Sequence, residues 1–289
     1  MTVDSSTELR PYDLPQATEN ASSEGATTAI TAPPSMPVER ADLIRAFDDG
    51  DLLLHYQPQV NVSGRWPEVI GYEALSRWPL PDGRFVPPDR FIPVAEDCGL
   101  ILTLDIWVID AVCREMARVK TDDASRSLSM AVNVSSKQFG QKHFAKSVAE
   151  ILTRTGVDPS CLVLEITERA VLDEDETTFS NIHALREIGI SLSLDDFGTG
   201  YSSLFHLRTL PIQEIKLDRS FVSGLPHRHR DAAILSATID LASNLGLRVV
   251  AEGVELAQQS EWLRMNGCQT IQGFLYGRPA ARSHHAITS

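Results

Sequence analysis

Residues 162–200 read LVLEITERAVLDEDETTFSNIHALREIGISLSLDDFGTG, and this stretch decides the fold. It opens with the apolar run LVLEIT, ends with a second run, ISLSLDD, and carries a helical pattern near residues 175–188 between them. Gly189 ends that helix, as glycine often does at a helix C-terminus. A strand, a helix and a second strand in this order predict a βαβ unit with two parallel strands.

The two strands alternate between apolar and polar side chains. Leu164 and Ile166 share one face of the first strand, and Glu165 lies on the other. In the second strand Leu194 lies opposite Asp195 in the same way. We therefore predict that the leucine faces pack against helices and that the acidic faces point into the mouth of a barrel.

Strand and helix patterns continue to alternate on both sides of this stretch. We predict helices over 39–49, 88–119 with a break at Gly99, 144–155, 175–188, 202–210, 230–245 and 256–265, and strands over 52–60, 69–78, 129–135, 162–167, 190–196, 214–218, 248–254 and 269–276. About eight strands over about 240 residues match a modified TIM (β/α)8 barrel. The first two strands read as a hairpin, which predicts one antiparallel strand. A doubly wound open sheet is the alternative, but its Gly-rich phosphate turn is missing after the early strands.

Composition limits the functions that the chain can have. The 289 residues are 43% hydrophobic and carry a formal net charge of -13, so direct, charge-driven DNA binding is not expected. No apolar stretch is long enough for a membrane span, and we expect no secretion signal. The four cysteines form no CxxC pair and are expected as free thiols, which favours a cytoplasmic location.

The N-terminal segment differs from the rest in composition. Residues 1–38 are rich in Ser, Thr, Ala, Pro and Glu, which predicts a disordered tail before one folded domain over 39–289. The alternative is a short segment that folds when it contacts a partner.

Polar motifs follow the apolar, strand-like runs at seven places. They are Glu73 in YEALSRW, Asn133 in AVNVS, Glu165 and Glu168 in LEITE, Asp195 and Asp196 in LSLDDFGTG, Lys216 in EIKLD, Glu252 in VVAEGVE and Gln272 in IQGFLYG. A barrel brings the C-terminal ends of its parallel strands to one rim. Each motif alone could be a helix cap, an ion pair or a turn. Together, a ring of carboxylates with one amide and one lysine predicts a site for Mg²⁺ or Mn²⁺ rather than zinc.

The order of these motifs resembles a known family. YEALSRW, NVS, EITE, DDFGTGYSSL, KLDRSFV, AEGVE and QGFLYGRP, from about Leu52 to Pro279, are similar to the EAL domain family of bacterial cyclic di-GMP phosphodiesterases. The resemblance implies a modified TIM barrel and two-metal hydrolysis of cyclic di-GMP to linear pGpG.

The resemblance also implies a role for each matching residue. The ligands of two divalent cations, Mg²⁺ or Mn²⁺, would be Glu73, Asn133, Glu165, Asp195, Asp196 and Glu252. Glu252 would be the general base, and Lys216 would steer the attacking water. The substrate contacts would be Gln57, Leu75, Arg77 and Gln272, while Glu168 and Glu255 would support the loops around the site.

Two positions depart from the family pattern. Gln213 and Gln269 stand where acids are common, which predicts weaker local loop contacts or metal occupancy and a lower rate.

Two other functions fit the same motifs. One is a cyclic di-GMP-responsive regulator that acts through a protein partner, for example to repress virulence, motility or surface-factor genes. The other is a metal-dependent hydrolase of a different phosphoester. Whatever the function, the family resemblance implies that the barrel can form a homodimer through the helices that follow the DDFGTG loop and the lysine strand, including Ser202–Leu210.

Overall fold

The computed structural model describes residues 38–118, 128–167, 176–198 and 204–281, with only the backbone at 204–206. The segment predicted as a disordered tail, residues 1–38, lies outside the described residues apart from Val38. The disorder of this segment therefore remains a prediction. None of the described helices combines the length and the apolar composition that a membrane-spanning helix needs.

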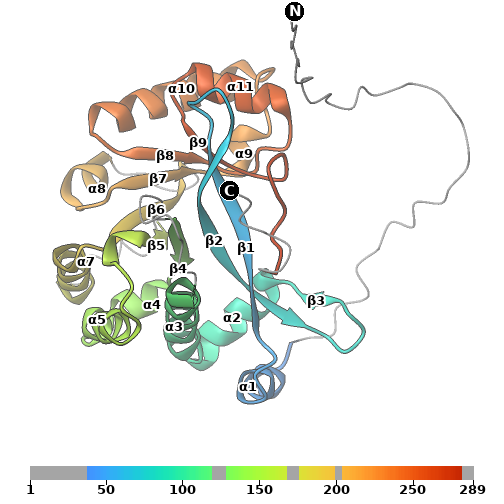
Figure 1. Ribbon diagram of the computed structural model, residues 1–289, viewed down its shortest axis with the longest axis vertical. Helices are drawn as coiled ribbons and strands as arrows, with labels where there is room; N and C mark the ends of the chain where they lie inside the picture. Colours follow the sequence, from blue (N-terminus) through green and yellow to red (C-terminus); the bar gives the residue numbers. More distant parts are fainter. Residues whose placement is uncertain (1–37, 119–127, 168–175, 199–203, 282–289) are drawn as a thin grey trace, which may run out of the picture. The chain divides into compact units, whose positions relative to one another are not determined.

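Eight strands close into a barrel (Figure 1). In order around the barrel they are β1 (Leu53–Asn61), β9 (Thr270–Gln272), β8 (Arg248–Ala251), β7 (Glu214–Leu217), β6 (Ser191–Phe197), β5 (Leu162–Thr167), β4 (Ser129–Asn133) and β2 (Glu68–Pro79). Pairing between β1 and β2 completes the ring, and the short β3 (Phe85–Val86) extends β2. The predicted modified TIM barrel is confirmed, and the open sheet is excluded.

The antiparallel strand is β1. It runs antiparallel to β2 and to β9, whereas the other neighbours around the ring are parallel. The register places Gln57 opposite Glu73, and Gln59 opposite Gln272. The opening hairpin therefore brings glutamines from the first and last strands to the same part of the barrel interior.

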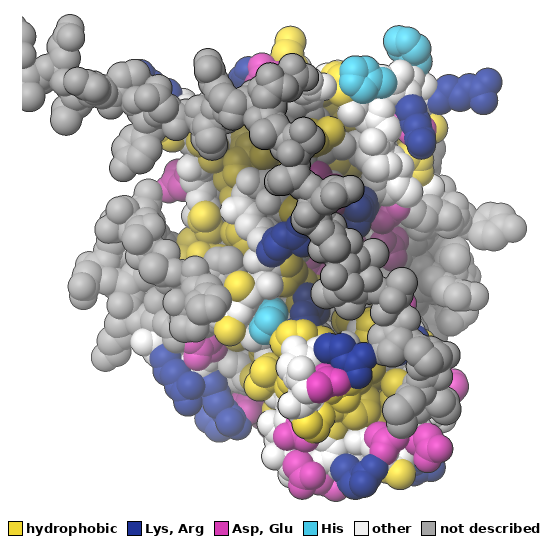
Figure 2. Space-filling model, turned by 90° about the vertical axis from the view of Figure 1, so that its right-hand side faces the viewer, with side chains coloured by type: hydrophobic (Ala, Val, Ile, Leu, Met, Phe, Trp, Pro, Cys, Tyr) yellow, Lys and Arg dark blue, Asp and Glu magenta, His cyan; other side chains and the backbone are white. Residues whose placement is uncertain are grey.

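Helices cover the outside of this sheet. They are α1 (Arg40–Asp48), α2 (Pro88–Cys98), α3 (Ile101–Arg118), α4 (Ser136–Phe139), α5 (Phe144–Thr155), α7 (Glu176–Ile188), α8 (Leu204–Thr209), α9 (Arg219–Val222), α10 (His229–Asn244) and α11 (Ala257–Met265), with a 3-10 turn at Pro159–Cys161. The predicted break between α2 and α3 is confirmed at Gly99, whose φ of 78° suits glycine. Charged side chains of both signs intermix over the lower end of Figure 2, the level at which α1 lies in Figure 1.

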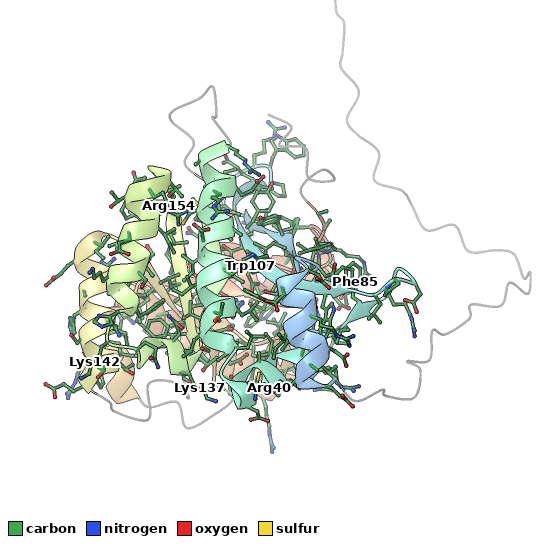
Figure 3. The ribbon with its side chains drawn as sticks, turned by 90° about the horizontal axis from the view of Figure 1, so that it is seen from below. Arg40, Phe85, Trp107, Lys137, Lys142 and Arg154 are labelled. Atoms are coloured by element: carbon green, nitrogen blue, oxygen red, sulfur yellow. The ribbon has the colours of Figure 1, made fainter. Side chains whose placement is uncertain are left out.

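The apolar core lies between the sheet and the helices. Leu162, Leu164 and Ile166 of β5 are fully buried in it, as the strand alternation predicts. Trp107 of α3, which Figure 3 labels, packs against this core and meets Phe47 of α1 edge-on, with ring centroids 6.3 Å apart.

The structure differs from the predictions in a few elements. The strand predicted over 269–276 ends at Gln272, because the backbone turns after it: the amides of Tyr276 and Gly277 both donate to the Gly273 carbonyl, each at 3.1 Å. The elements β3, α4 and α9 were not predicted. Each has two to four residues, which is too short for a periodic pattern.

Candidate active site at the barrel rim

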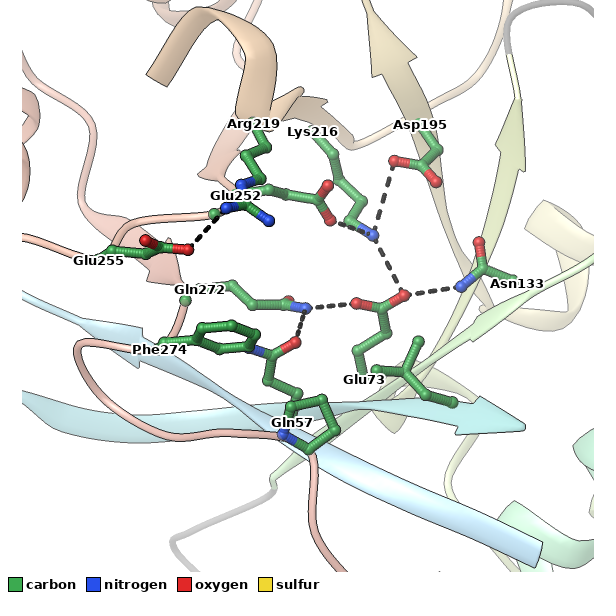
Figure 4. A pocket seen from close by; sticks show the side chains of 14 residues that line it. Gln57, Glu73, Asn133, Asp195, Lys216, Arg219, Glu252, Glu255, Gln272 and Phe274 are labelled. Carbon is green, nitrogen blue, oxygen red and sulfur yellow. Dashed lines mark hydrogen bonds and ion pairs between the residues drawn. The ribbon is translucent and has the colours of Figure 1, made fainter. Parts of the chain in front are cut away.

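The C-terminal ends of successive strands deliver polar side chains to one rim (Figure 4). The chain positions are Glu73 on β2, Asn133 at the end of β4, Glu165 on β5, Asp195 on β6, Lys216 on β7, Glu252 directly after β8 and Gln272 at the end of β9. The parallel strands place these residues together, as the sequence predicted.

Lys216 lies at the centre of the acidic cluster, with 1% of its side chain exposed. Its Nζ atom is 2.6 Å from Glu252, 2.8 Å from Glu165, 3.5 Å from Glu73 and 3.6 Å from Asp195. Burial alone would lower the pKa of Lys216, but the four carboxylates together raise that pKa well above its usual value. Lys216 is therefore a charged ammonium that compensates several acids at once.

One ammonium does not balance these carboxylates. Burial, reinforced by the neighbouring acids, raises the pKa of Glu165 well above its usual value and the pKa of Glu252 to about 7. The Oε1 atom of Glu165 is buried and has no hydrogen-bond partner among the described residues. The four carboxylates therefore carry more negative charge than Lys216 can neutralise. The Oε1 atom of Glu165 is also available as an oxygen ligand for a cation.

Amide side chains hold Glu73 in place. Asn133 donates its Nδ2 hydrogen to Glu73 at 2.7 Å, and Gln272 donates Nε2 hydrogens to Glu73 and, at 3.3 Å, to Gln57. Gln59 in turn donates to the Gln272 oxygen at 3.1 Å. Although burial raises the pKa of Glu73, the charge of Lys216 and these hydrogen bonds lower it below the usual value.

A pocket of about 430 Å³ opens above the cluster. Its lining includes most of the predicted site residues: Gln57, Glu73, Leu75, Asn133, Asp195, Lys216, Glu252, Glu255 and Gln272. It also includes five residues that sequence reasoning missed, which are Arg219, Gly253, Gly273, Phe274 and Pro279. Gly273 and Phe274 fall within residues 269–276, where the sequence predicts a strand, and Pro279 lies beyond that range.

Of the predicted site residues that the structure describes, three do not line the pocket. Glu165 lies against Lys216, at 1% exposure. Arg77 is half-buried and donates to the Ser76 carbonyl at 2.9 Å, and Asp196 has an exposed side chain at a φ of 55°. Glu168 lies outside the described residues.

The side-chain oxygens of the cluster are of the chemical type that binds divalent cations. Glu73, Asn133, Glu165 and Asp195 offer carboxylate and amide oxygens, which Mg²⁺ and Mn²⁺ prefer. Among the described side chains, no group of three acids, histidines or cysteines converges as it stands for coordination, and the Lys216 ammonium occupies the centre instead. Cation binding would therefore require the Lys216 ammonium to shift from some of these oxygens.

The two departures from the family pattern lie away from the rim. Gln213 precedes β7, where its side chain accepts from the Leu192 amide at 2.9 Å and donates to the Pro211 carbonyl at 2.7 Å. The Gln269 carbonyl, before β9, accepts from the Val62 amide at 2.9 Å. Both residues lie at the starts of strands, at the opposite end from the acidic cluster. Their predicted effect on the rate of hydrolysis remains a prediction.

Comparison with known proteins places the chain in a family. The EAL domain model matches residues 40–279. The chain is 43% identical over 238 residues to the bifunctional diguanylate cyclase/cyclic di-GMP phosphodiesterase MucR of Pseudomonas aeruginosa, covering 82% of this chain and 34% of MucR. It is 42% identical to the cyclic di-GMP phosphodiesterase NbdA of the same organism, covering 82% of this chain and 30% of NbdA. The chain thus spans about a third of the length of these relatives.

Solved structures agree with this placement. The PaMucR phosphodiesterase in its c-di-GMP complex has a TM-score of 0.79 at 40% identity, covering 85% of this chain and 98% of that one. The EAL domain of Mycobacterium smegmatis DcpA has a TM-score of 0.69 at 36% identity, covering 81% of this chain and 95% of that one. The chain therefore belongs to the EAL domain family.

Proposed function

We propose that the chain is a cyclic di-GMP-specific phosphodiesterase that hydrolyses its substrate to linear pGpG. The observation that carries this proposal is the buried acidic cluster around Lys216 at the floor of the rim pocket. The relatives named as cyclic di-GMP phosphodiesterases, and the MucR complex with c-di-GMP, supply the substrate.

The oxygens of Glu73, Asn133, Glu165 and Asp195 would hold one cation, and Asp195, Asp196 and Glu252 would hold a second. When bound, two Mg²⁺ or Mn²⁺ ions would offset the phosphate charge and make a water molecule more acidic. The unpaired Glu165 oxygen and the excess of carboxylates support this assignment.

Glu252 would take the proton of the attacking water. Its carboxylate lines the pocket, and its Oε1 atom lies 2.6 Å from Lys216, which orients the carboxylate. Burial raises the pKa of Glu252 to about 7 in the absence of cations. Cations bound beside it would favour the ionised carboxylate, which is the form that accepts a proton. Lys216 would stay protonated throughout and stabilise the charge that develops on the phosphate.

The substrate would lie across the pocket against Gln57, Leu75 and Gln272. Gln57 and Gln272 hydrogen-bond to each other, so their positions are fixed before binding. Arg77 would contact a phosphate once its guanidinium leaves the Ser76 carbonyl.

Hydrolysis of cyclic di-GMP by the purified protein, with Mg²⁺ or Mn²⁺, tests the proposal. We expect pGpG from the wild type and at least about a hundredfold lower rate from Glu73→Ala, because the variant loses a cation ligand. Glu150→Ala is the matched control, since Glu150 lies on the surface and pairs with Lys146 at 3.7 Å. Binding of cyclic di-GMP without turnover by folded protein would contradict the enzyme and favour a regulator that acts through a partner.

We also propose a cytoplasmic location and a homodimer. The four cysteines are free, which suits a reducing compartment.

The homodimer would form through a helix that follows the lysine strand. Ile234 of α10 is 49% exposed and is available for a dimer contact. Light scattering of wild type and Ile234→Glu would test the dimer: we expect the variant alone to be monomeric.

A further inference from the structure

Arg219 lies at the mouth of the rim pocket, on the side away from Asn133 and Asp195 (Figure 4). It begins α9, directly after the N-cap residue Asp218. Its Nη2 atom lies 2.8 Å from Oε1 of Glu255, and both side chains line the pocket. The roles described above give Arg219 no function and give Glu255 only the support of a loop.

The backbone around Gly253 fixes the direction of Arg219. Gly253 has a φ of 65°, and a Cβ on it would lie 2.3 Å from Cγ and 2.6 Å from Cβ of Arg219. The stem of Arg219 thus rests directly on this glycine, which lies next to Glu252. A side chain held in this way loses less conformational freedom when a ligand binds it.

Arg219 is also the more accessible of two cations among the described lining residues. Lys216 is buried and shared between four carboxylates. Arg219 is 62% exposed and pairs with Glu255 through one nitrogen, and a guanidinium carries five N–H donors. It can therefore donate to a ligand without giving up Glu255.

An aromatic surface lies at the same end of the pocket. Phe274 lines the pocket and is 41% exposed, with the Arg278 guanidinium 4.1 Å from its ring centroid. An exposed aromatic ring beside a charged pair is suited to a planar base, which gains stacking energy on the ring.

We propose that the Arg219–Glu255 pair reads the guanine of cyclic di-GMP that lies outside the cation cluster. Arginine donates to O6 and N7 of guanine, and a carboxylate accepts from the adjacent N1–H and N2–H groups. A donor and an acceptor 2.8 Å apart match these adjacent edges. Adenine carries a donor in place of O6, so the same pair disfavours it. This inference rests on the proposed function and adds the residue that selects the base.

Three dinucleotides and two variants test this role. The substrates are cyclic di-GMP, its 7-deaza analogue, which lacks N7, and cyclic di-AMP. The variants are Arg219→Met and, as a matched control, Arg264→Met, because Arg264 forms an exposed ion pair with Glu261, also at 2.8 Å, and does not line the pocket. We would measure kcat and KM with Mg²⁺, and equilibrium binding in EDTA.

For Arg219→Met we expect KM and Kd for cyclic di-GMP to rise about tenfold or more, with kcat changed less than about threefold. The preference for cyclic di-GMP over cyclic di-AMP should fall by a similar factor. Removing N7 should weaken binding to the wild type and to Arg264→Met, but not to Arg219→Met.

Three results would overturn the inference. The first is an unchanged KM and Kd in Arg219→Met. The second is an equal loss for all three dinucleotides, which would mean a non-selective charge effect. The third is a wild type that binds no cyclic di-GMP, which would overturn the proposed function as well. A wild type that binds cyclic di-GMP but does not hydrolyse it contradicts only the proposed function, because the binding comparison still tests Arg219.

Discussion

Lys216 sets the charge balance of the rim, since its ammonium contacts Glu73, Glu165, Asp195 and Glu252 while almost fully buried. Removing one partner of a buried ion pair is far more costly than removing a surface pair, because it leaves a buried charge uncompensated. The same carboxylates would be compensated by bound cations. Stability and cation binding should therefore be linked at this residue.

Lys216→Met should lower the free energy of unfolding by about 3–5 kcal/mol in EDTA. Excess Mg²⁺ should restore part of this loss, because the cations bind only the folded cluster. Urea unfolding with and without Mg²⁺ measures both effects. Lys146→Met, at an exposed pair with Glu150, should cost at most about 1 kcal/mol in either condition. An equal loss in both lysine variants would show that the buried cluster has no special energetic role.

At this scale, strand parity was sufficient to predict the inward direction of Glu165, Asp195 and Lys216. Arg219 could not be predicted in the same way, because the four-residue helix α9 has too few residues to show a periodic pattern. Its place at the pocket depends on Gly253, which is 34 positions away in sequence and meets it only in the fold.

At the scale of elements, strands β2 and β4 approach each other closely at Gly71. A Cβ there would lie 2.2 Å from the Ser129 hydroxyl and 2.6 Å from the Ser129 carbonyl oxygen. Since Glu73 lies two residues further along β2 and accepts from Asn133 of β4, this contact sets the spacing of two cation ligands.

Gly71→Ala should destabilise the protein by about 1–3 kcal/mol, because the backbone carbonyl must move away. It should also weaken Mg²⁺ binding by separating Glu73 from Asn133. Chemical unfolding and isothermal titration measure the two effects. Gly64→Ala is the control, since the nearest atom to a Cβ there is 3.5 Å away. Equal stability of the two variants would mean that the β2–β4 contact is not tight.

A second contact between elements joins helix α3 to the segment after β4. Asp105 is 5% exposed and accepts from the Ser135 amide at 3.1 Å and from the Ser135 hydroxyl at 2.5 Å. Ser135 is the N-cap of α4 and lies two residues after Asn133. Burial raises the pKa of Asp105 from 3.8 to about 6, although the Ser135 hydrogen bonds oppose this rise.

A raised pKa means that the folded protein binds the Asp105 proton more tightly than the unfolded chain does. Its contribution to stability should therefore be largest below about pH 4 and be lost as the pH rises through about 6. The loss should amount to about 3 kcal/mol. Asp105→Asn should lack this step, so its stability relative to the wild type should rise between pH 4 and pH 6. A difference that stays flat over this range, in urea unfolding, would contradict the assignment.

Short elements limited what the sequence could predict at this scale. The long helices and strands carry periodic patterns and were predicted nearly to their ends, for example α5 at Phe144–Thr155. The end of β9 depends on the turn at Gly273, whose carbonyl accepts from the Tyr276 and Gly277 amides, and the apolar pattern of residues 269–276 does not show this turn.

At the scale of the whole molecule, closure of the barrel depends on a strand that runs against the rest. Strand alternation predicted this closure, but the register that joins Gln59 to Gln272 follows from three-dimensional packing.

The described fold begins at Val38, so we predict that removing residues 1–37 leaves the melting temperature and the rate of hydrolysis unchanged. Thermal unfolding and the hydrolysis assay on residues 38–289 would test this, and a loss in either would give the tail a role.

The central claim is that the rim directs a water molecule onto a phosphate of cyclic di-GMP. The most direct measurement is mass spectrometry of the product formed with Mg²⁺ in ¹⁸O-labelled water. We predict linear pGpG with one ¹⁸O atom in its terminal phosphate, and at least about a hundredfold less of it from Glu73→Ala in the same time. Absence of pGpG from folded wild type, or pGpG without the label, would contradict the claim.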